Sequence, residues 1–576
     1  MISYRKLAMR ILGRPFTFLG GGGISQTRPL PQRAAALTLT AALLTGAAFP
    51  AFADTYYIEN GDIVISAGTE AGTNKVEQGG TLKSANDRGT IISSSNKDTA
   101  SDNTVTINAA NEKDKVEVTL KDLNIDAGST GSAAVSVTGS GDTTIELDGS
   151  NTLNSGSGHA GLEHNKTDTS GELTIQDNDK NGSLKAAGGQ YGAGIGGGSD
   201  GGGKNITISG GTVTAAGGNY GAGIGGGDYG SGEDITINGG TVTATGGFRG
   251  AGIGGGGSGG GGKNITINSG TVNATGGEDG AGIGGGGSGI GGKNITIKGG
   301  TVNAAGGKGS AGIGGGLGGS GENITINGGA VDAKGGNQGA GIGGGVSSSG
   351  ENITISGGTV TAAGGYFAAG IGGGSGGSGS NVTVSGAAQV TAVAGKSKTN
   401  HYYPYNKIDS GATIGNGSRV MSDALVNGEE IQADISGLMT TGYIHHIIYN
   451  EDGSVKQEWR EFGHLQPAPD TPNAPAEESN EVDLGTPLLH VETLEGGPLP
   501  FNARQQGGTL RVTSDTLSAR LHGTRQALET LQEQGVEQIQ FVTTLKTTTL
   551  SVEDLLAEGG SWFALEHDGL GSRRLS

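Results

Sequence analysis

The stretch that decides the fold runs from Asn205 to Glu233 and reads NITISGGTVTAAGGNYGAGIGGGDYGSGE. It is one of seven copies between Lys185 and Val393. The isoleucine of the AGIGGG segment recurs in steps of 29 or 30 residues, at Ile195, Ile224, Ile253, Ile283, Ile313, Ile342 and Ile371. The first isoleucine of NITI keeps the same period. A fixed period of this length, with polar and glycine spacers, indicates a solenoid.

Within one copy the apolar residues alternate with polar or small ones in short runs. Ile206 and Ile208 flank Thr207, and Val213 and Ala215 flank Thr214. Alternation with a period of two predicts half-buried strands, with Ile, Val and Ala facing inward. Glycine pairs at 210–211 and 217–218 separate the runs, and we expect them to supply positive φ. Short strands repeated in register make an all-β fold, a parallel β-helix whose rungs stabilise one another.

The composition limits the compartment and the partners. The chain has 576 residues, 123 glycines, no cysteine and a formal net charge of −19. An acidic chain argues against nucleic acid as a partner, because phosphate binding needs clustered Lys and Arg. Arg28 and Arg33 precede an apolar run at 34–49, and Ala51-Phe52-Ala53 gives a small-x-small cleavage signal. We read residues 1–53 as a signal peptide, and we expect a secreted or cell-surface protein with no transmembrane segment in the mature chain.

The rest of the chain divides by changes in pattern. We predict irregular β-helix rungs at 54–184, seven regular repeats at 185–395, and a β-rich cap at 396–465 that includes a hairpin around 444–453. Residues 466–481 are rich in proline and predict a linker. Residues 482–576 predict a small α+β domain. Its expected elements are a helix at 524–534, a strand at 539–543 and a second helix that Ser551 caps.

Three segments of the irregular region carry a family resemblance. They read VTLKDLNIDAG (118–128), SAAVSVTGSGDTTIELDGSNTL (132–153) and GELTIQDNDKNGSL (171–184). These segments are similar to bacterial secreted carbohydrate-binding β-helix proteins, whose fold resembles that of polysaccharide lyases. The GAGIGGG array looks like glycine-rich repeats of bacterial surface proteins. The resemblance implies a right-handed parallel β-helix, binding of polysaccharide or a cell-surface glycan, and bound calcium as the one cofactor left open.

The most variable part of the repeat is the dipeptide before GAGIGGG. Its aromatic and basic members are the candidate carbohydrate-binding residues: Tyr191, Tyr220, Phe248, Arg249, Tyr366 and Phe367. The dipeptides fall at a turn, so we expect them to be exposed and stacked along one edge. Aromatic rings there could contact the C–H face of a sugar, with Tyr191 and Tyr220 touching one extended glycan together. Simple decoration of a turn is the alternative.

Three other motifs have plainer explanations. Asp177, Asp179 and Asn181 match the start of a calcium loop, but Gly188 stands where the carboxylate at the twelfth position belongs, so a plain turn is favoured. GAGIGG at 192–197 matches G-x-G-x-x-G, but no helix follows it, so it is structural. The asparagine that opens NITI predicts a ladder or a turn cap rather than a glycan.

No catalytic set of residues stands out. The leading interpretation is therefore an exported, non-enzymatic polysaccharide-binding or adhesive surface protein. A polysaccharide lyase or glycoside hydrolase on the same scaffold is the alternative. A third interpretation, ice binding through the threonines of the T-V-T runs, is weakened because Asn273, Asn303, Ala330 and Asp332 interrupt those columns.

Overall fold

A computed structural model describes most of residues 53–575. The residues left out of the description are 1–52, 166–168, 288–290, 398–409, 422–423, 427, 464–488, 495–498, 500, 515, 517, 544–545, 558–559, 561, 569–570 and 576. The predicted signal peptide, apart from Ala53, and the predicted proline-rich linker lie outside the described residues. The chain forms two compact units, 1–467 and 468–576, each with its own hydrophobic core.

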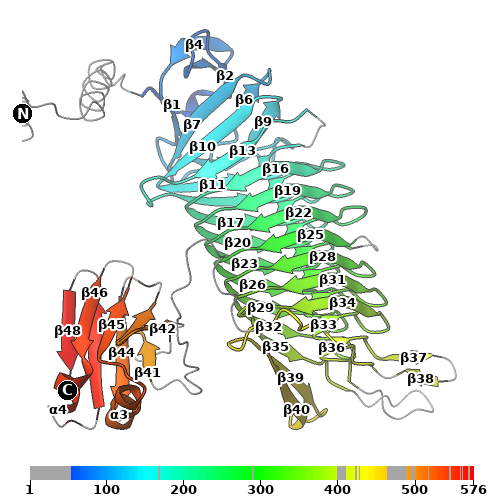
Figure 1. The fold of residues 1–576 in the computed structure, drawn as a ribbon. Coiled ribbons are helices and arrows are strands. Elements are labelled where there is room, and N and C mark those ends of the chain that lie inside the picture. The colour runs from blue at the N-terminus through cyan, green and yellow to red at the C-terminus, as the bar shows by residue number, and fades with distance from the viewer. Residues whose placement is uncertain are drawn as a thin grey trace, which may run out of the picture. The chain divides into compact units, whose positions relative to one another are not determined.

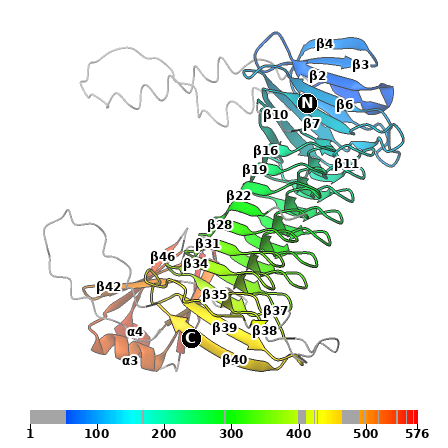
Figure 2. The same ribbon diagram turned by 90° about the vertical axis from the view of Figure 1, so that its right-hand side faces the viewer.

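The first unit is a parallel β-solenoid with three long sheets, as the repeat predicts (Figures 1 and 2). Each regular copy gives one strand to each sheet, and we name the sheets after the repeat: NITI, TVT and GIGG. Consecutive copies pair in parallel with identical residues in register, as with Ile206 and Ile235. The aligned Ile, Val and Ala side chains form one continuous buried core.

The strands of the NITI sheet are, in spatial order, β1 (Thr55–Tyr57), β5 (Thr90–Ser93), β7 (Lys115–Lys121), β10 (Asp142–Asp148), β13 (Leu173–Gln176), β16 (Gly203–Ile208), β19 (Gly232–Ile237), β22 (Gly262–Ile267), β25 (Gly292–Ile297), β28 (Gly321–Ile326), β31 (Gly350–Ile355) and β34 (Gly379–Val384). Those of the TVT sheet are β8 (Asn124–Asp126), β11 (Ser150–Asn154), β14 (Ser183–Ala187), β17 (Thr212–Ala216), β20 (Thr241–Thr245), β23 (Thr271–Thr275), β26 (Thr301–Ala305), β29 (Ala330–Lys334), β32 (Thr359–Ala363), β35 (Gln389–Val393), β39 (Tyr443–Tyr449) and β40 (Val455–Phe462).

The GIGG sheet has mostly two-residue strands, because glycine-rich turns take up the rest of each copy. Its order is β4 (Thr81–Asp87), β3 (Asn74–Gln78), β2 (Ile63–Ala67), β6 (Val105–Ala109), β9 (Val135–Gly139), β12 (Leu162–Glu163), β15 (Ile195–Gly196), β18 (Ile224–Gly225), β21 (Ile253–Gly254), β24 (Ile283–Gly284), β27 (Ile313–Gly314), β30 (Ile342–Gly343), β33 (Ile371–Gly372) and β36 (Ile414–Gly415). A short helix (η1, Ile58–Asn60) follows β1, and β37 (Arg419–Met421) pairs with β38 (Ala424–Val426).

Antiparallel hairpins lie at both ends of the stack. At the N-terminal end β2, β3 and β4 pair antiparallel, which the sequence did not predict. At the other end β39 adds to β35 in parallel and pairs with β40 in the predicted hairpin. The first hairpin extends the GIGG sheet and the second extends the TVT sheet, while the NITI sheet ends at β1 and β34.

The glycines act partly in a different way from the one predicted. Among the pairs 210–211 and 217–218, only Gly211 has a positive φ, at 79°. Gly217 and Gly218 are required for close approach instead, because a Cβ at either position would overlap a backbone oxygen of Gly221 or Gly189. The expectation of positive φ is therefore wrong at Gly210, Gly217 and Gly218. Gly217 is required by crowding within its own turn, and Gly218 by crowding against the turn of the preceding copy.

Positive φ occurs instead at the residue that opens NITI. Its φ lies between 52° and 56° in every regular copy, at Asn205, Asp234, Asn264, Asn294, Asn323, Asn352 and Asn381. Asn and Asp adopt this conformation more readily than other non-glycine residues. The side chains also bond along the column, as in Asn294 Nδ2 to Asn264 Oδ1 at 2.9 Å. The predicted asparagine ladder is confirmed.

The second unit has two four-stranded sheets and two helices. One sheet has the order β41 (Leu489–Glu492), β44 (Ser518–Thr524), β47 (Trp562–Asp568), β48 (Gly571–Leu575), and the other β42 (Asn502–Gln506), β43 (Thr509–Thr513), β45 (Gln538–Val542), β46 (Thr547–Ser551). Helix α3 (Arg525–Glu533) begins at its cap Thr524, and α4 (Val552–Ala557) follows Ser551, whose hydroxyl accepts from Asp554 N. Both helices and β45 were predicted. Among the described residues, no helix is long and apolar enough to cross a membrane.

Candidate functional site

The variable dipeptides form two aligned columns at one turn of the solenoid. The first member of each pair is exposed in every copy, and the second is half-buried in all copies but the fifth, where it is the buried Gly309. The carbonyl of the second member accepts a hydrogen bond from the next copy, as from Asp228 N to Tyr191 O at 2.8 Å. The expectation that all the candidate residues are exposed is thus met by Phe248 and Tyr366, while Tyr191, Tyr220, Arg249 and Phe367 are only half exposed.

Three of the candidate residues form one stack along this column. The rings of Tyr191 and Tyr220 lie face to face, with centroids 5.5 Å apart and an interplanar angle of 17°. The guanidinium of Arg249 lies 5.9 Å from the centre of the Tyr220 ring and pairs with Asp279 at 3.6 Å. Burial raises the pKa of Asp279, and Arg249 opposes that shift. The two tyrosines therefore do not present two open faces to one glycan, because each covers a face of the other.

Tyr366 and Phe367 form a separate group. They lie four copies beyond Phe248 and Arg249, roughly 19 Å away at about 4.8 Å per rung. Their rings are tilted, with centroids 6.1 Å apart. The fifth copy interrupts the column, because Leu317 fills the space beside Gly309. The candidate residues thus form two aromatic groups rather than one continuous edge.

One exposed aromatic residue near the first group was missed. Tyr229 is 63% exposed and has a φ of 59°, a conformation that is unusual for a bulky side chain. Other copies place Asp200, Ser347 or Gly376 at this position. An aromatic residue among small and polar ones at the same repeat position was the signal available in the sequence.

The candidate calcium residues meet a carboxylate from the neighbouring rung. Ligand atoms of Glu146, Asp177 and Asp179 lie within 4.8 Å of one another. The loop satisfies these carboxylates itself: Asn178 donates to Glu146, Asn181 Nδ2 donates to Asp179 at 2.8 Å, and Gly182 N donates to Asp177 at 3.0 Å. Asn181 therefore turns an NH₂ group rather than its oxygen toward the carboxylates. Calcium takes six to eight oxygens, so these side chains fit the ion only in part.

The C-terminal cap contains a buried histidine whose pKa is lowered. His445 and His446 point to opposite faces of β39, as predicted: His445 bonds Glu458, while His446 is buried, with its Nδ1 2.6 Å from Thr413 Oγ1. Burial, with His445 adding to it, lowers the pKa of His446 to about 4. Trp459 stacks on the imidazole with centroids 4.4 Å apart. Thr413 has no exposed surface, so this set of residues holds the cap together and offers no access to a substrate.

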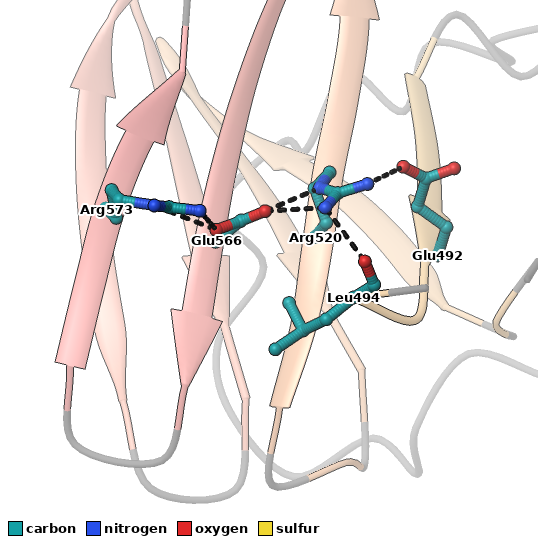
Figure 3. Close-up of polar contacts among 5 residues, drawn as sticks. All are labelled: Glu492, Leu494, Arg520, Glu566 and Arg573. Atoms are coloured by element: carbon teal, nitrogen blue, oxygen red, sulfur yellow. Dashed lines mark hydrogen bonds and ion pairs between the residues drawn. The ribbon is translucent and has the colours of Figure 1, made fainter. Parts of the chain in front are cut away.

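A row of alternating charges crosses the β41–β44–β47–β48 sheet of the second unit (Figure 3). Arg520 bonds both Glu492 and Glu566, and Arg573 bonds the other oxygen of Glu566. These bonds hold the pKa of Glu566 below its usual range. Arg520 also donates to the carbonyl of Leu494, as Figure 3 shows. The carboxylate of Glu566 is shared between two arginines. The row of charges therefore joins the strands of the sheet, and both oxygens of Glu566 are already bonded.

Comparison with known families agrees with the fold. Six segments match a family model described as "Beta helix repeat", at residues 206–228, 235–262, 265–292, 295–317, 324–346 and 353–375. Each matched segment begins at the first isoleucine of NITI, one residue after the left-handed asparagine or aspartate. No curated protein and no solved structure matches the chain. The comparison thus defines a class of repeat scaffold.

Proposed function

We propose that this chain is an exported, non-enzymatic β-solenoid that binds polysaccharide or acts as an adhesive stalk at a cell surface. The observation that carries the proposal is where the repeat varies. Buried Ile, Val and Ala keep their places from copy to copy, while the turn dipeptides change and hold Tyr191, Tyr220 and Phe248 at an edge. Half-exposed aromatic rings on a rigid scaffold suit contact with the C–H faces of sugars.

Two of the titratable groups with altered pKa are enclosed in the cap, which supports a role without catalysis, whereas Asp279, whose pKa burial raises, is half-buried at the turn column and pairs with Arg249. A catalytic acid or base needs an altered pKa at a place that substrate can reach. Among the described residues, the histidine whose pKa falls to about 4 is His446, which is buried in the cap beside Thr413. Burial also raises the pKa of Glu430, but its carboxylate accepts bonds from the backbone of Thr413 and Ile414.

The experiment for this proposal is a glycan-array screen of the full chain, with and without calcium. We expect retention by one or a few polysaccharide classes, independent of calcium, because contacts through the turn column need no ion. Ile283→Asp, which buries an unpaired charge in the core, is the unfolded control. A folded native chain that is retained by no glycan would refute the proposal.

A polysaccharide lyase is the second candidate, and one observation favours it. The carboxylates of Glu146, Asp177 and Asp179 cluster on adjacent rungs, and Lys121 pairs with Asp148 nearby at 2.6 Å. Carboxylates that hold calcium beside a base would suit proton abstraction from an acidic sugar, but the ion pair with Asp148 raises the pKa of Lys121 and disfavours Lys121 as that base. Incubation with polygalacturonate and calcium tests this candidate directly. Release of unsaturated product that Asp177→Asn abolishes would replace the binding proposal.

A further inference from the structure

The aromatic stack has one end that is open toward the preceding rung. Tyr220 is covered on one face by Tyr191 and lies against Arg249 on the other. Because the tyrosines stack face to face between adjacent rungs, the second face of Tyr191 is directed toward the rung before it. What lies at the matching position of that rung decides whether this face is available.

The matching position is Gly158. Ser199 N donates to Gly158 O at 2.7 Å, just as Asp228 N donates to Tyr191 O one rung later. Gly158 has no side chain, and a Cβ built on it would meet nothing within 4 Å. The column of side chains therefore starts at Tyr191, with open space where the preceding member would lie.

Polar groups border this space. His159, the next residue in the chain, bonds Glu163 with Nδ1 and Oε2 2.8 Å apart, and its side chain is 38% exposed. The other oxygen of Glu163 accepts from Asn165 Nδ2 at 2.9 Å. Ser199 is exposed on the adjoining turn. An exposed imidazole next to Gly158 in the chain and an exposed hydroxyl on the turn that bonds Gly158 could offer hydrogen bonds to the hydroxyl groups of a sugar.

The charges around this position are mostly negative. Glu163, Asp200 and Asp228 lie on these turns. Of the basic side chains in the adjoining turns and strands, Arg249 contacts Tyr220 and Asp279, Lys204 lies 4.0 Å from Asp234, and Lys185 is exposed on β14. An anionic sugar at Tyr191 would be repelled by the carboxylates of these turns. The position therefore suits an uncharged ring.

We infer that the outer face of Tyr191, above Gly158, is a stacking platform for one uncharged hexopyranose ring of a neutral polysaccharide. Tyr220 and Arg249 are positioning residues that fix the Tyr191 ring. This inference rests on the proposed function and deepens it, because it places the contact at the first regular copy and names the class of sugar. A single stacking contact gives weak binding, with a Kd on the order of millimolar.

The test is NMR titration of the full chain with short soluble oligosaccharides of glucose, N-acetylglucosamine and galacturonate. We expect binding of a neutral oligosaccharide and none of galacturonate. Tyr191→Ala should weaken the neutral ligand roughly fivefold to tenfold, the loss of about 1 kcal/mol of stacking. Tyr191→Phe should retain binding. Gly158→Asn should abolish it, because the side chain fills the open space; the φ of 91° at Gly158 strains this variant, so its binding is compared only if its melting curve shows that it is folded.

Tyr366→Ala is the matched control, since it removes a ring of the second aromatic group and should leave the affinity unchanged. Melting curves verify that each variant is folded. If the native chain binds but Tyr191→Ala and Gly158→Asn bind equally well, the platform is wrong and the proposed function survives. Preference for galacturonate would overturn the inferred sugar class. If the native chain binds no saccharide in the titration or on the array, the proposed function fails with it.

Discussion

Replacing Gly250 by alanine should destabilise the solenoid, although it adds only one methyl group. Gly250 lies in a stacked turn of the third copy, and its Cβ would overlap the carbonyl oxygen of Gly221 in the rung before it. Its φ is not positive, so the effect is steric and not conformational. Real Cβ atoms essentially never come within 3.0 Å of such an atom, so the two turns must move apart.

The magnitude follows from the bonds that hold these turns together. Gly247 N donates to Gly221 O, and Gly277 N donates to Gly250 O, each at 2.9 Å. A lost bond that leaves a buried group unsatisfied costs about 1–3 kcal/mol, and overpacking costs a similar amount. We expect a loss of roughly 2–4 kcal/mol, concentrated in the third copy and its neighbours because each rung contacts only adjacent rungs.

Gly259→Ala is the matched control from the same copy. The nearest atom to a Cβ at Gly259 is 3.6 Å away, and its φ is not positive. This substitution should leave the free energy of unfolding unchanged or raise it by up to about 1 kcal/mol, because alanine has less conformational freedom than glycine in the unfolded chain. Denaturant unfolding of both variants, with hydrogen exchange to locate the effect, measures the difference. Equal stability of the two variants would refute the claim that close-packed turns require glycine.

Three further predictions concern the ladder, the cap and the acidic loop. Asn294→Ala should lower the free energy of unfolding, measured with denaturant, by about 1–2 kcal/mol, because ladder hydrogen bonds are lost and alanine must adopt a left-handed conformation. Asn294→Asp should cost less, because Asp234 already occupies this position in another copy. The pKa of His446 is about 4 in the folded chain and about 6.5 in the unfolded chain. As pH falls, the unfolded chain therefore binds the proton before the folded chain does. The free energy of unfolding should fall by up to about 3 kcal/mol between pH 6.5 and 4. Burial raises the pKa of Glu430, so protonation of Glu430 should stabilise the fold as pH falls and oppose the effect of His446. Unfolding of His446→Gln at several pH values isolates the contribution of the imidazole. An unchanged pH dependence of stability in that variant would contradict the assignment. Chelation of calcium should leave the melting temperature unchanged, because amide groups already satisfy Asp177 and Asp179; a rise in melting temperature that requires calcium and is lost in Asp177→Asn would contradict this.

The solenoid could be predicted from the sequence because the period of the repeat determines which residues pair between neighbouring strands. When Ile206 and Ile235 recur 29 residues apart with the same neighbours, parallel stacking brings like residues together, and the structure pairs them. The N-terminal hairpins escaped prediction because β2, β3 and β4 occur once. Alternation alone does not distinguish an antiparallel return from another rung.

The candidate site was predicted by position but not by geometry. The variable dipeptides do lie at an edge, but the sequence did not reveal that Tyr191 and Tyr220 stack on one another, because rotamers are chosen by the neighbours. Glu146 was missed beside Asp177 for a related reason. The two are far apart in the sequence, and only the register of β10 against β13 brings them together.

Co-sedimentation of the full chain with insoluble neutral polysaccharide, with reducing and unsaturated ends measured in the same supernatant, tests binding without catalysis most directly. We expect that the native chain is retained, that Tyr191→Ala is retained less, and that no new ends appear above background. Release of new chain ends, or failure of the folded native chain to be retained, would contradict a non-enzymatic binding solenoid.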